Sequence, residues 1–590
     1  RRQRQMCIRD RYRKEPLFLA VCSEEPISFE RLKRDLREFF SIPNDELVSL
    51  ETDRLGTFYT PGYFEPLAGS FLNRQGEDAM TVSSHSIYEE ECIQKPEHGL
   101  TRFFGRVHSG KADIADFPAP LAIFQVKKPS ESVVCYNDSF GAGRIYYARE
   151  KNFTVVSNSI PAAALARRRQ CESNEDFWAP YYCGGAVGEA TFIRGISLVP
   201  AGSRLVIKPG TFSLRSTPLG TQLKQQINEP VKATGTLETL LSPLRALSQL
   251  IELPRPIVGL SGGRDSRLVA ALTLNAGMAA QYQTWFPPKL ETEIAAELVG
   301  ALSQDVDWVS IDRSELKADS PVGDLRSRTR DWFTFTGGDH WSTFIRRAAP
   351  PKNTTSQTVP DYSISGLGGE VTRGSLYLES EAAAGDAEPA LRRYIDRSLK
   401  YWPLISRDIR ERSRILYQEA LLESFVEGFN GFHALDLTEM NTNYRRMIPP
   451  PNPGIVAPLF SLSLARAAFG ASPLERIRSQ PLREITEMLV PEWIGKPYYH
   501  EVAATRNDPK DNKVTIQPTH WEVDRADFLE SMEAALAVTD FANLTMGEVE
   551  KEIESPSDGR NRTNILFETI LWHGAAAEQV IDINRILRRP

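Results

Sequence analysis

The sequence has few cysteines, and they are confined to its first third. The six are Cys7, Cys22, Cys92, Cys135, Cys171 and Cys183, and no two form a C-x-x-C pair. Because zinc sites and disulfide frameworks depend on paired or regularly spaced cysteines, both are disfavoured and a reducing cytoplasm is the expected location. No run of 18 apolar residues occurs, which predicts no membrane partner. No G-x-x-x-x-G-K-[ST] motif occurs, which excludes phosphate binding of the Walker type.

The chain also lacks an excess of positive charge. It has 70 Lys and Arg against 77 Asp and Glu, a net charge of −7. With no stripe of basic and aromatic residues, this balance predicts no nucleic-acid partner. A length of 590 residues with 41% hydrophobic and 25% charged residues is typical of a globular protein with two or more domains. A homodimer is one arrangement that the sequence leaves open.

Residues 1–14, RRQRQMCIRDRYRK, differ from everything that follows. They contain seven basic residues and one acidic residue, with no apolar segment of the kind found in a signal peptide. QRQMCIRD resembles translated sequencing-adapter sequence. We therefore expect this segment to be artefactual and the natural N-terminus to be missing.

The most informative segment is PRPIVGLSGGRDSRLVAAL, residues 254–272. Ile257–Leu260 is an apolar run typical of a buried parallel strand, and an apolar-periodic helix is expected from about Arg267. Two glycines between them predict a sharp turn whose N–H groups and helix N-terminus face one anion. The predicted nucleotide-binding loop consists of Leu260, Ser261, Gly262, Gly263, Arg264, Asp265 and Ser266.

Within this loop, Asp265 is the candidate ligand for a phosphate-bound Mg²⁺, which prefers carboxylate oxygen. ATP and Mg²⁺ are therefore the expected cofactors. The loop resembles the pyrophosphate loop (PP-loop) of ATP pyrophosphatases, which cleave ATP to AMP and pyrophosphate. An ordinary glycine-rich strand-to-helix turn is the structural alternative.

The chain around this loop divides into two expected domains, residues 16–215 and residues 237–590, joined by a polar, turn-rich linker over residues 217–235. In the first, we predict strands at Leu17–Val21, Ala122–Val126, Val133–Tyr136, Ile145–Ala148, Thr154–Ser157 and Leu205–Ile207, with helices near Phe29–Phe40 and Ile160–Arg169. In the second, helices at 237–251 and Glu291–Leu302 alternate with strands at Ala280–Trp285 and Trp308–Ile311. This alternation predicts a doubly wound α/β sheet, followed by helices near 389–428 and 461–489.

A second set of residues resembles the amidotransferase half of asparagine synthetases. The residues are Asp138, Gly141, Tyr146, Tyr147, Ser157, Thr191, Phe192, Gly195, Ile196, Pro200 and Gly202. Together with the loop and the later segments described next, this resemblance covers about residues 120–500. It implies an α+β N-terminal domain like the Ntn hydrolases, an αββα sandwich, followed by a PP-loop (HUP-type) α/β domain.

Later segments extend the resemblance. GLGGEVTRGSLY, residues 366–377, lies where the family has a second glycine-rich acidic motif, which implies nucleotide contacts for Gly366 and Gly368. Ala434–Arg445 and Ala457–Phe460 resemble the following helix and turn of the family. The resemblance further implies that Glu370 is a catalytic and metal-binding residue and that Lys496 is a catalytic residue that stabilises charge during transfer.

The sequence also departs from the family pattern. Leu367 and Gly369 stand where family members usually have Glu and Asp. We expect Arg264, Arg267 and Arg373 to compensate in part by pairing with phosphate, with solvated surface charge as the alternative. Trp285 is a candidate for stacking on adenine or for filling the core, and His340 is expected to be structural.

The glutaminase half is expected to be degenerate. Family members use an N-terminal cysteine followed by glycine, whereas Ile8 follows Cys7, and Cys22 ends a predicted strand and is interpreted as a buried thiol. No Arg-Gly-Pro-Asp or Asn-Gly-Glu motif is present.

Three functions follow from these observations. The first is an ATP-dependent carbon–nitrogen ligase that joins a small carboxylate to ammonia or an amine, including glutamine-independent relatives that resemble β-lactam synthetase or lasso-peptide cyclase. The second is a degenerate nucleotide-binding homologue. The third, a sulfur-transferring pyrophosphatase, is disfavoured by the absence of cysteine after Cys183.

Overall fold

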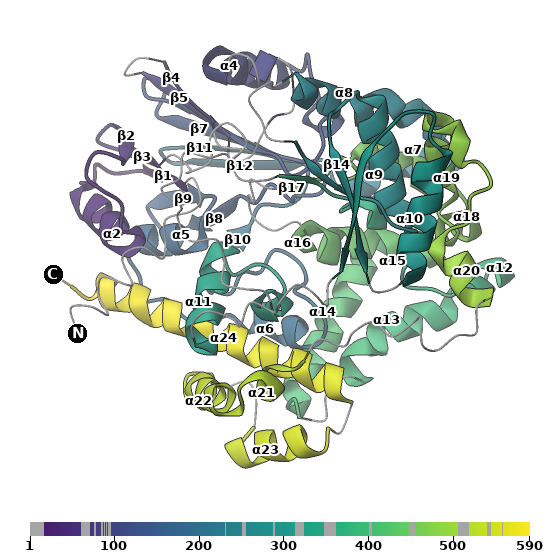
Figure 1. Ribbon diagram of the computed structural model, residues 1–590. Coiled ribbons are helices and arrows are strands. Elements are labelled where there is room, and N and C mark those ends of the chain that lie inside the picture. Colours follow the sequence, from purple (N-terminus) through teal and green to yellow (C-terminus); the bar gives the residue numbers. More distant parts are fainter. Residues whose placement is uncertain are drawn as a thin grey trace.

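A computed structural model describes the chain at residues 17–60, 71–75, 78–83, 87, 89, 91–92, 96–230, 232–249, 255–286, 289–312, 324–346, 362–400, 404–447, 455–505, 518–539, 544–556 and 559–589. The protein is a mixed α/β protein with antiparallel sheets in the first part of the chain and a parallel sheet in the second (Figure 1). The expected artefactual segment and Cys7 lie outside the described residues.

The first part of the chain forms two six-stranded antiparallel sheets. One has the order β10-β8-β9-β1-β3-β2, with β10 (Ser197–Leu198), β8 (Tyr146–Arg149), β9 (Phe153–Ser157), β1 (Leu17–Ser23), β3 (Leu55–Thr60) and β2 (Val48–Glu51). The other has the order β12-β11-β7-β6-β5-β4, with β12 (Thr211–Ser216), β11 (Ser203–Lys208), β7 (Ser132–Asn137), β6 (Ala122–Lys127), β5 (Ala79–Ser83) and β4 (Phe71–Gln75).

Side-chain alternation along β1 explains how these sheets are layered. Leu17, Leu19 and Val21 face a core shared with helices α2 (Glu30–Phe40) and α5 (Ile160–Arg167). Phe18 and Cys22 face the second sheet, where Phe18 stacks on Phe124 of β6 at 4.2 Å between ring centroids. Helix α4 (Pro96–His108) covers the far face of the second sheet. Both faces of β1 are thus buried, and the layers run helix, sheet, sheet, helix.

All six strands and both helices predicted for this part are present, whereas β2, β3, β4, β5, β10 and β12 were not predicted. The predicted turn-rich linker is wrong in its local structure. It contains helix α7 (Leu219–Asn228), whose Leu219 and Leu223 are buried and which packs against α17 (Leu462–Gly470). Thr221, Lys224 and Gln225 are the exposed face of this amphipathic helix.

The second part is organised around a five-stranded parallel sheet of order β15-β14-β13-β16-β17. Its strands are β15 (Asp307–Asp312), β14 (Gln281–Phe286), β13 (Ile257–Gly259), β16 (Ser363–Ile364) and β17 (Ile455–Val456). From β13, the chain first adds strands on one side and then continues with β16 on the other. The point between β13 and β16 is therefore the switch point of the sheet, where ligands bind in open α/β folds.

Helices account for most of the remaining chain. Those near the parallel sheet are α8 (Leu237–Ser248), α9 (Arg264–Asn275), α10 (Lys289–Ala301), α19 (Gln480–Leu489) and α20 (Tyr499–Thr505). Others are α6 (Glu175–Tyr182), α11 (Leu325–Phe335), α12 (Glu379–Ala384), α13 (Glu388–Lys400), α14 (Arg407–Val426), α15 (Gly431–Glu439), α16 (Arg445–Met447), α18 (Pro473–Ile477), α21 (His520–Val523), α22 (Arg525–Leu536) and α23 (Met546–Glu554).

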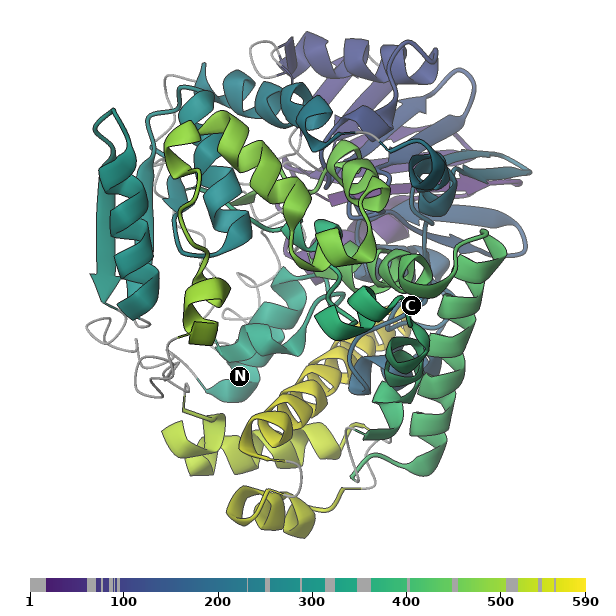
Figure 2. The ribbon, with the colours of Figure 1, turned by 90° about the vertical axis from the view of Figure 1, so that its right-hand side faces the viewer.

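The longest helix, α24 (Arg560–Leu587), joins the two parts of the molecule. It packs against α2, α5 and α6 of the first part and against α11 and α22 of the second. Figure 2 shows α24 in yellow, above the yellow-green helices α22 and α23. Near its end, the Asn584 side chain accepts a bond from Cys171 N–H (2.7 Å) and donates one to Cys171 C=O (2.9 Å). No described helix has the length and apolar character that crossing a membrane requires.

Candidate functional site

The predicted nucleotide-binding loop lies at the carboxyl end of β13, beside the switch point of the parallel sheet. Residues Ser261–Gly263 leave the strand, and α9 begins at Arg264, three residues earlier than predicted. Asp265 therefore lies in the first turn of α9, where N–H groups are free of helical partners. The strand, loop and helix thus occur in the predicted order at the place in the sheet where ligands are usually bound.

The loop is held by its own hydroxyl groups. Ser261 Oγ lies 2.8 Å from Ser266 Oγ and accepts a hydrogen bond from Gly263 N–H at 3.0 Å. The N–H of Gly262 donates to the carboxylate of Glu291, in the first turn of α10. Glu291 was not predicted as a site residue. An acidic side chain thus binds one of the loop donors expected to bind phosphate.

Gly262 is required for close packing rather than for a left-handed turn. A Cβ atom at this position would lie 2.8 Å from Tyr499 Cβ and 2.9 Å from Ile294 Cδ1. The backbone N–H of Tyr499 also donates to Gly262 C=O at 2.9 Å. The chain does bend at residues 261–263, as predicted, but close packing is what requires glycine at residue 262, because the start of α20 covers this side of the loop.

The second glycine-rich loop follows β16 and contacts the first directly. Gly366 and Gly369 both lie against Asp265, and a Cβ atom at Gly369 would be 2.4 Å from Asp265 Oδ1. Gly368 has φ +95°, and Glu370 Oε2 accepts its N–H at 3.0 Å. The structure thus brings Asp265 and Glu370, which the resemblance assigns to one metal site, close together across the switch point.

Arg373 joins the two acidic residues. Its Nη2 lies 2.7 Å from Asp265 Oδ2 and 3.2 Å from Glu370 Oε1. By contrast, Asp265 Oδ1 is buried and accepts no hydrogen bond from any described residue. A buried carboxylate oxygen without a donor is unfavourable and is a reasonable position for a ligand.

The environment of Asp265 also changes its acidity. Burial raises the pKa of Asp265 to about 6, the negative charge of Glu370 acts in the same direction, and Arg373 and Arg264 oppose both. The carboxylate is therefore harder to ionise than an exposed one, and a positive charge brought to Oδ1 would favour its ionised form.

The other two candidate arginines have structural partners. Arg264 Nη1 donates to Ile477 C=O (2.8 Å) and Ser479 Oγ (2.7 Å). Arg267 is buried with its guanidinium 3.8 Å from the centre of the Tyr498 ring, and it donates to the carbonyls of Lys496 and Pro497 at 3.0 and 2.7 Å. Arg267 is therefore neither a solvated surface charge nor a group placed to pair with phosphate. It holds the Lys496–Pro497 backbone beside the loop.

Lys496 and Trp285 lie at the edge of the site. The Lys496 backbone is held by Arg267, but its ammonium is 2.8 Å from Glu297 Oε1 on α10 and its side chain is 30% exposed. Trp285, near the carboxyl end of β14, is 37% exposed. Trp285 therefore does not fill the core. The Lys496 ammonium is paired with Glu297 and not with Asp265 or Glu370.

The described cysteines are buried thiols. Cys22 is the sixth residue of β1, is 2% exposed, and burial raises the pKa of its thiol to about 12. Cys92, Cys135, Cys171 and Cys183 are also buried and form no disulfide with a described residue. Because the thiolate is the nucleophile, none of these five residues has the environment of a catalytic cysteine.

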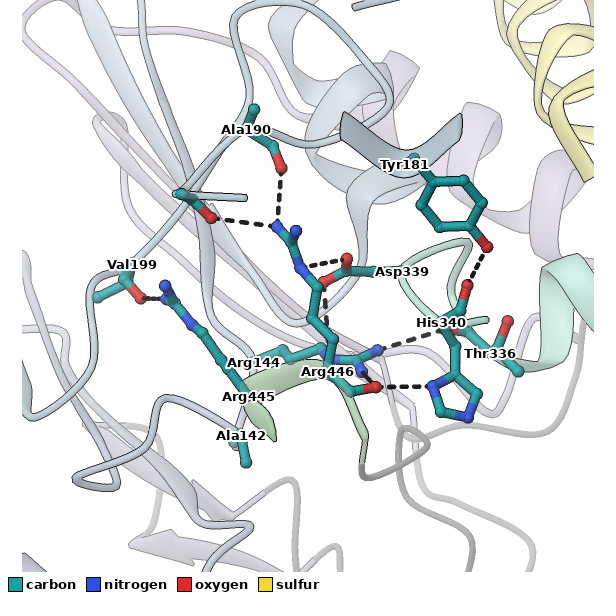
Figure 3. Close-up of polar contacts among 12 residues, drawn as sticks. Ala142, Arg144, Tyr181, Ala190, Val199, Thr336, Asp339, His340, Arg445 and Arg446 are labelled. Carbon is teal, nitrogen blue, oxygen red and sulfur yellow. Dashed lines mark hydrogen bonds and ion pairs between the residues drawn. The ribbon is translucent and has the colours of Figure 1, made fainter. Parts of the chain in front are cut away.

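A buried network of charged groups lies between the two parts of the chain (Figure 3). Arg446 Nε is 2.8 Å from Asp339 Oδ1, and Arg446 Nη2 donates to the carbonyls of Gly188 (3.2 Å) and Ala190 (3.0 Å). Arg144 Nε is 3.7 Å from Asp339 Oδ2, and His340 Nδ1 lies 2.7 Å from Arg446 C=O. These contacts assign a structural role to His340, as expected.

The described residues contain no group of three or more His, Cys, Asp or Glu side chains arranged to hold a metal ion. Comparisons with protein-family models and with curated proteins find no match for this chain. The functional argument therefore rests on the two loops at the switch point and on the residues around them.

Proposed function

We propose that this protein is an ATP-dependent carbon–nitrogen ligase. In the proposed reaction, a carboxylate oxygen of a small acid attacks the α-phosphorus of ATP and releases pyrophosphate. Ammonia or an amine then attacks the activated carbonyl and releases AMP, so that an amide forms. The asparagine synthetase family, which the sequence resembles, carries out this class of chemistry.

The observation that carries this proposal is the contact between two glycine-rich loops at the switch point of a parallel sheet. One loop brings Asp265 and the N-terminus of α9, and the other brings Glu370 and Arg373. A helix N-terminus favours the negative charge of phosphate. The layered antiparallel sheets of the first part further support the resemblance to a synthetase with an Ntn-hydrolase-like domain, and the parallel sheet supports a PP-loop domain.

The residues present fit a nucleotide with a phosphate-bound Mg²⁺. Asp265 Oδ1, which is buried and accepts no hydrogen bond from the described residues, is the candidate ligand, and oxygen ligands of this kind suit Mg²⁺. Glu370 was predicted as a second ligand, but its two oxygens lie on Arg373 and Gly368 N–H. When bound, Mg²⁺ would offset phosphate charge, while the loop residues orient the nucleotide.

A glutamine-independent reaction is favoured over one that hydrolyses glutamine. Cys22 lies inside a strand with a raised thiol pKa, and no described cysteine is exposed. We therefore place the protein with relatives that resemble β-lactam synthetase or lasso-peptide cyclase. Release of ammonia from glutamine by the purified chain would contradict this assignment.

The proposal is tested by exchange of labelled pyrophosphate into ATP in the presence of Mg²⁺ and a panel of carboxylic acids. We expect exchange with at least one acid and none with Asp265→Ala, because that change removes the candidate metal ligand. Asp307→Ala removes an exposed partner of Arg255 on β15 and serves as the matched control with unchanged exchange. Absence of both nucleotide binding and exchange in the unaltered chain would refute the ligase.

A further inference from the structure

The position between the Asp265 and Glu370 carboxylates is taken by a guanidinium group of the protein itself. A single nitrogen, Arg373 Nη2, approaches both carboxylates, at 2.7 and 3.2 Å. Two carboxylates facing a polyphosphate would repel it, so a cation is required at this place. In this chain that cation is part of the second loop.

The packing of the loops leaves little room for another acidic ligand. The Cα of Gly369 is so close to Asp265 that a Cβ atom there would be 2.4 Å from Oδ1 and 2.5 Å from Cγ. A carboxylate side chain at residue 369 could not be accommodated without moving Asp265. The absence of an acidic residue at position 369 and the presence of Arg373 are therefore parts of one arrangement.

Arg373 also has donors for a further anion. Its side chain is 34% exposed, and Nε and Nη1 donate to no described residue. Guanidinium groups bind phosphate oxygens through two parallel N–H bonds, which a compact ammonium cannot provide. Nη2 of this guanidinium can thus hold the two carboxylates while Nε and Nη1 bind phosphate oxygens.

We propose that Arg373 is the resident cation of the polyphosphate site, so that nucleotide and pyrophosphate bind the two loops without a divalent ion between Asp265 and Glu370. This inference rests on the proposed function, because it assumes that the loops bind nucleotide. It assigns Arg373 a direct phosphate contact and leaves Asp265 Oδ1 as the place where a metal carried by the nucleotide would meet the protein.

The test is calorimetric titration with α,β-methylene-ATP, which cannot be cleaved between the first two phosphates, and with inorganic pyrophosphate. Each ligand is titrated with excess EDTA and with Mg²⁺. We expect the unaltered chain to bind both ligands in EDTA within about tenfold of its affinity in Mg²⁺. Arg373→Met should weaken binding in EDTA by about tenfold or more, because a charge-assisted contact is lost.

Arg478→Met is the matched control, because Arg478 forms an exposed ion pair with Glu379 outside the site. It should leave both affinities unchanged. Arg373→Lys keeps the charge without the planar fork and should weaken binding in EDTA less than Arg373→Met. Arg373→Lys decides the question if circular dichroism shows that Arg373→Met does not fold.

The outcomes separate the two proposals. Binding that requires Mg²⁺ in the unaltered chain, or equal affinity of Arg373→Met and the unaltered chain in EDTA, overturns the role of Arg373 and leaves the ligase standing. If the unaltered chain binds neither ligand under either condition, the nucleotide site itself is refuted, and the ligase with it.

Discussion

At the scale of single residues, the structure differs from the sequence-based prediction mainly in the positions of the charged ends of long side chains. Lys496 was predicted from resemblance to act on the reacting groups, and its backbone does lie beside the loop through Arg267. Its ammonium, however, is paired with Glu297. Four rotatable bonds separate the backbone of a lysine from its ammonium. The position of the residue in the sequence therefore indicates where the backbone lies but not where the ammonium lies.

A catalytic role for Lys496 predicts a specific combination of effects. Lys496→Ala should lower amide formation by about a hundredfold or more once an acid substrate is known, because a donor to developing charge is removed. It should change the free energy of unfolding by no more than about 1 kcal/mol, since both partners of the ion pair with Glu297 are partly exposed to solvent. Glu297→Gln should retain amide formation. Full activity of Lys496→Ala, measured by product formation, would remove Lys496 from the mechanism.

His573 is a residue whose burial has a consequence for pH. It lies in α24, 3.0 Å from the Tyr182 hydroxyl and stacked on Trp178, and burial lowers its pKa to about 3. A histidine with a lowered pKa in the folded state stays neutral there while the unfolded chain becomes protonated. The contribution of His573 to stability is therefore complete above about pH 6.5 and is lost as the pH falls toward 3.

We accordingly expect the unaltered chain to lose about 2 kcal/mol more stability between pH 7 and pH 5 than His573→Gln does. Urea unfolding at the two pH values measures this difference, and any uniform loss of stability in the variant cancels. His98→Gln, at an exposed position of α4, should show the same pH dependence as the unaltered chain. Equal slopes for His573→Gln and the unaltered chain would contradict the assignment.

At the scale of elements, α10 brings an acidic side chain to the loop that is proposed to bind phosphate. The carboxylate of Glu291 accepts the N–H of Gly262, which the bound phosphate would also use. Glu291→Ala should tighten binding of α,β-methylene-ATP about three- to tenfold, because one competing acceptor and one negative charge are removed. Glu293→Ala, on the same helix and paired with Lys289, is the control with little change. Weaker binding by Glu291→Ala would show that Glu291 assists the nucleotide.

The elements themselves were predicted well where the pattern is strong and local. The strand and helix around the loop, and the alternating helices and strands up to β15, follow from apolar periodicity and glycine placement. Strands β16 and β17 contain only two residues each, too few for a recognisable period. Their place beside β13 depends on contacts between distant segments, so the switch point was predicted only as part of a fold class.

The contacts of the site were harder to predict, because they too join segments that are distant in the sequence. Asp265 and Glu370 were assigned to one site by the resemblance of their two motifs to a family, and the structure brings both residues to Arg373, while their role as metal ligands stays a prediction. Glu291 was missed because a glutamate in the first turn of a helix is common and usually solvated. Helix α7 was mistaken for a linker because most of its residues are polar, with only Leu219, Leu223 and Ile227 as large apolar side chains.

At the scale of the whole molecule, the two parts are connected by α24 and by the buried network of Figure 3. Arg446 follows the π-helix Met440–Tyr444 and reaches the carbonyls of Gly188 and Ala190 in the first part of the chain. Its guanidinium also compensates the buried charge of Asp339. A π-helix widens the turn and often marks a functional position, which fits a residue that spans two units.

Removal of Arg446 should therefore destabilise the molecule as a whole. Arg446→Met leaves Asp339 with the more distant Arg144, and an uncompensated buried charge costs about 3–5 kcal/mol. Arg412→Met removes an exposed pair with Asp176 that also links the two parts, and it should cost no more than about 1 kcal/mol. Urea unfolding followed by circular dichroism measures both. If Arg446→Met costs no more than Arg412→Met, the buried network does not hold the two parts together, and the packing of α24 and of α6 against α14 is left to connect them.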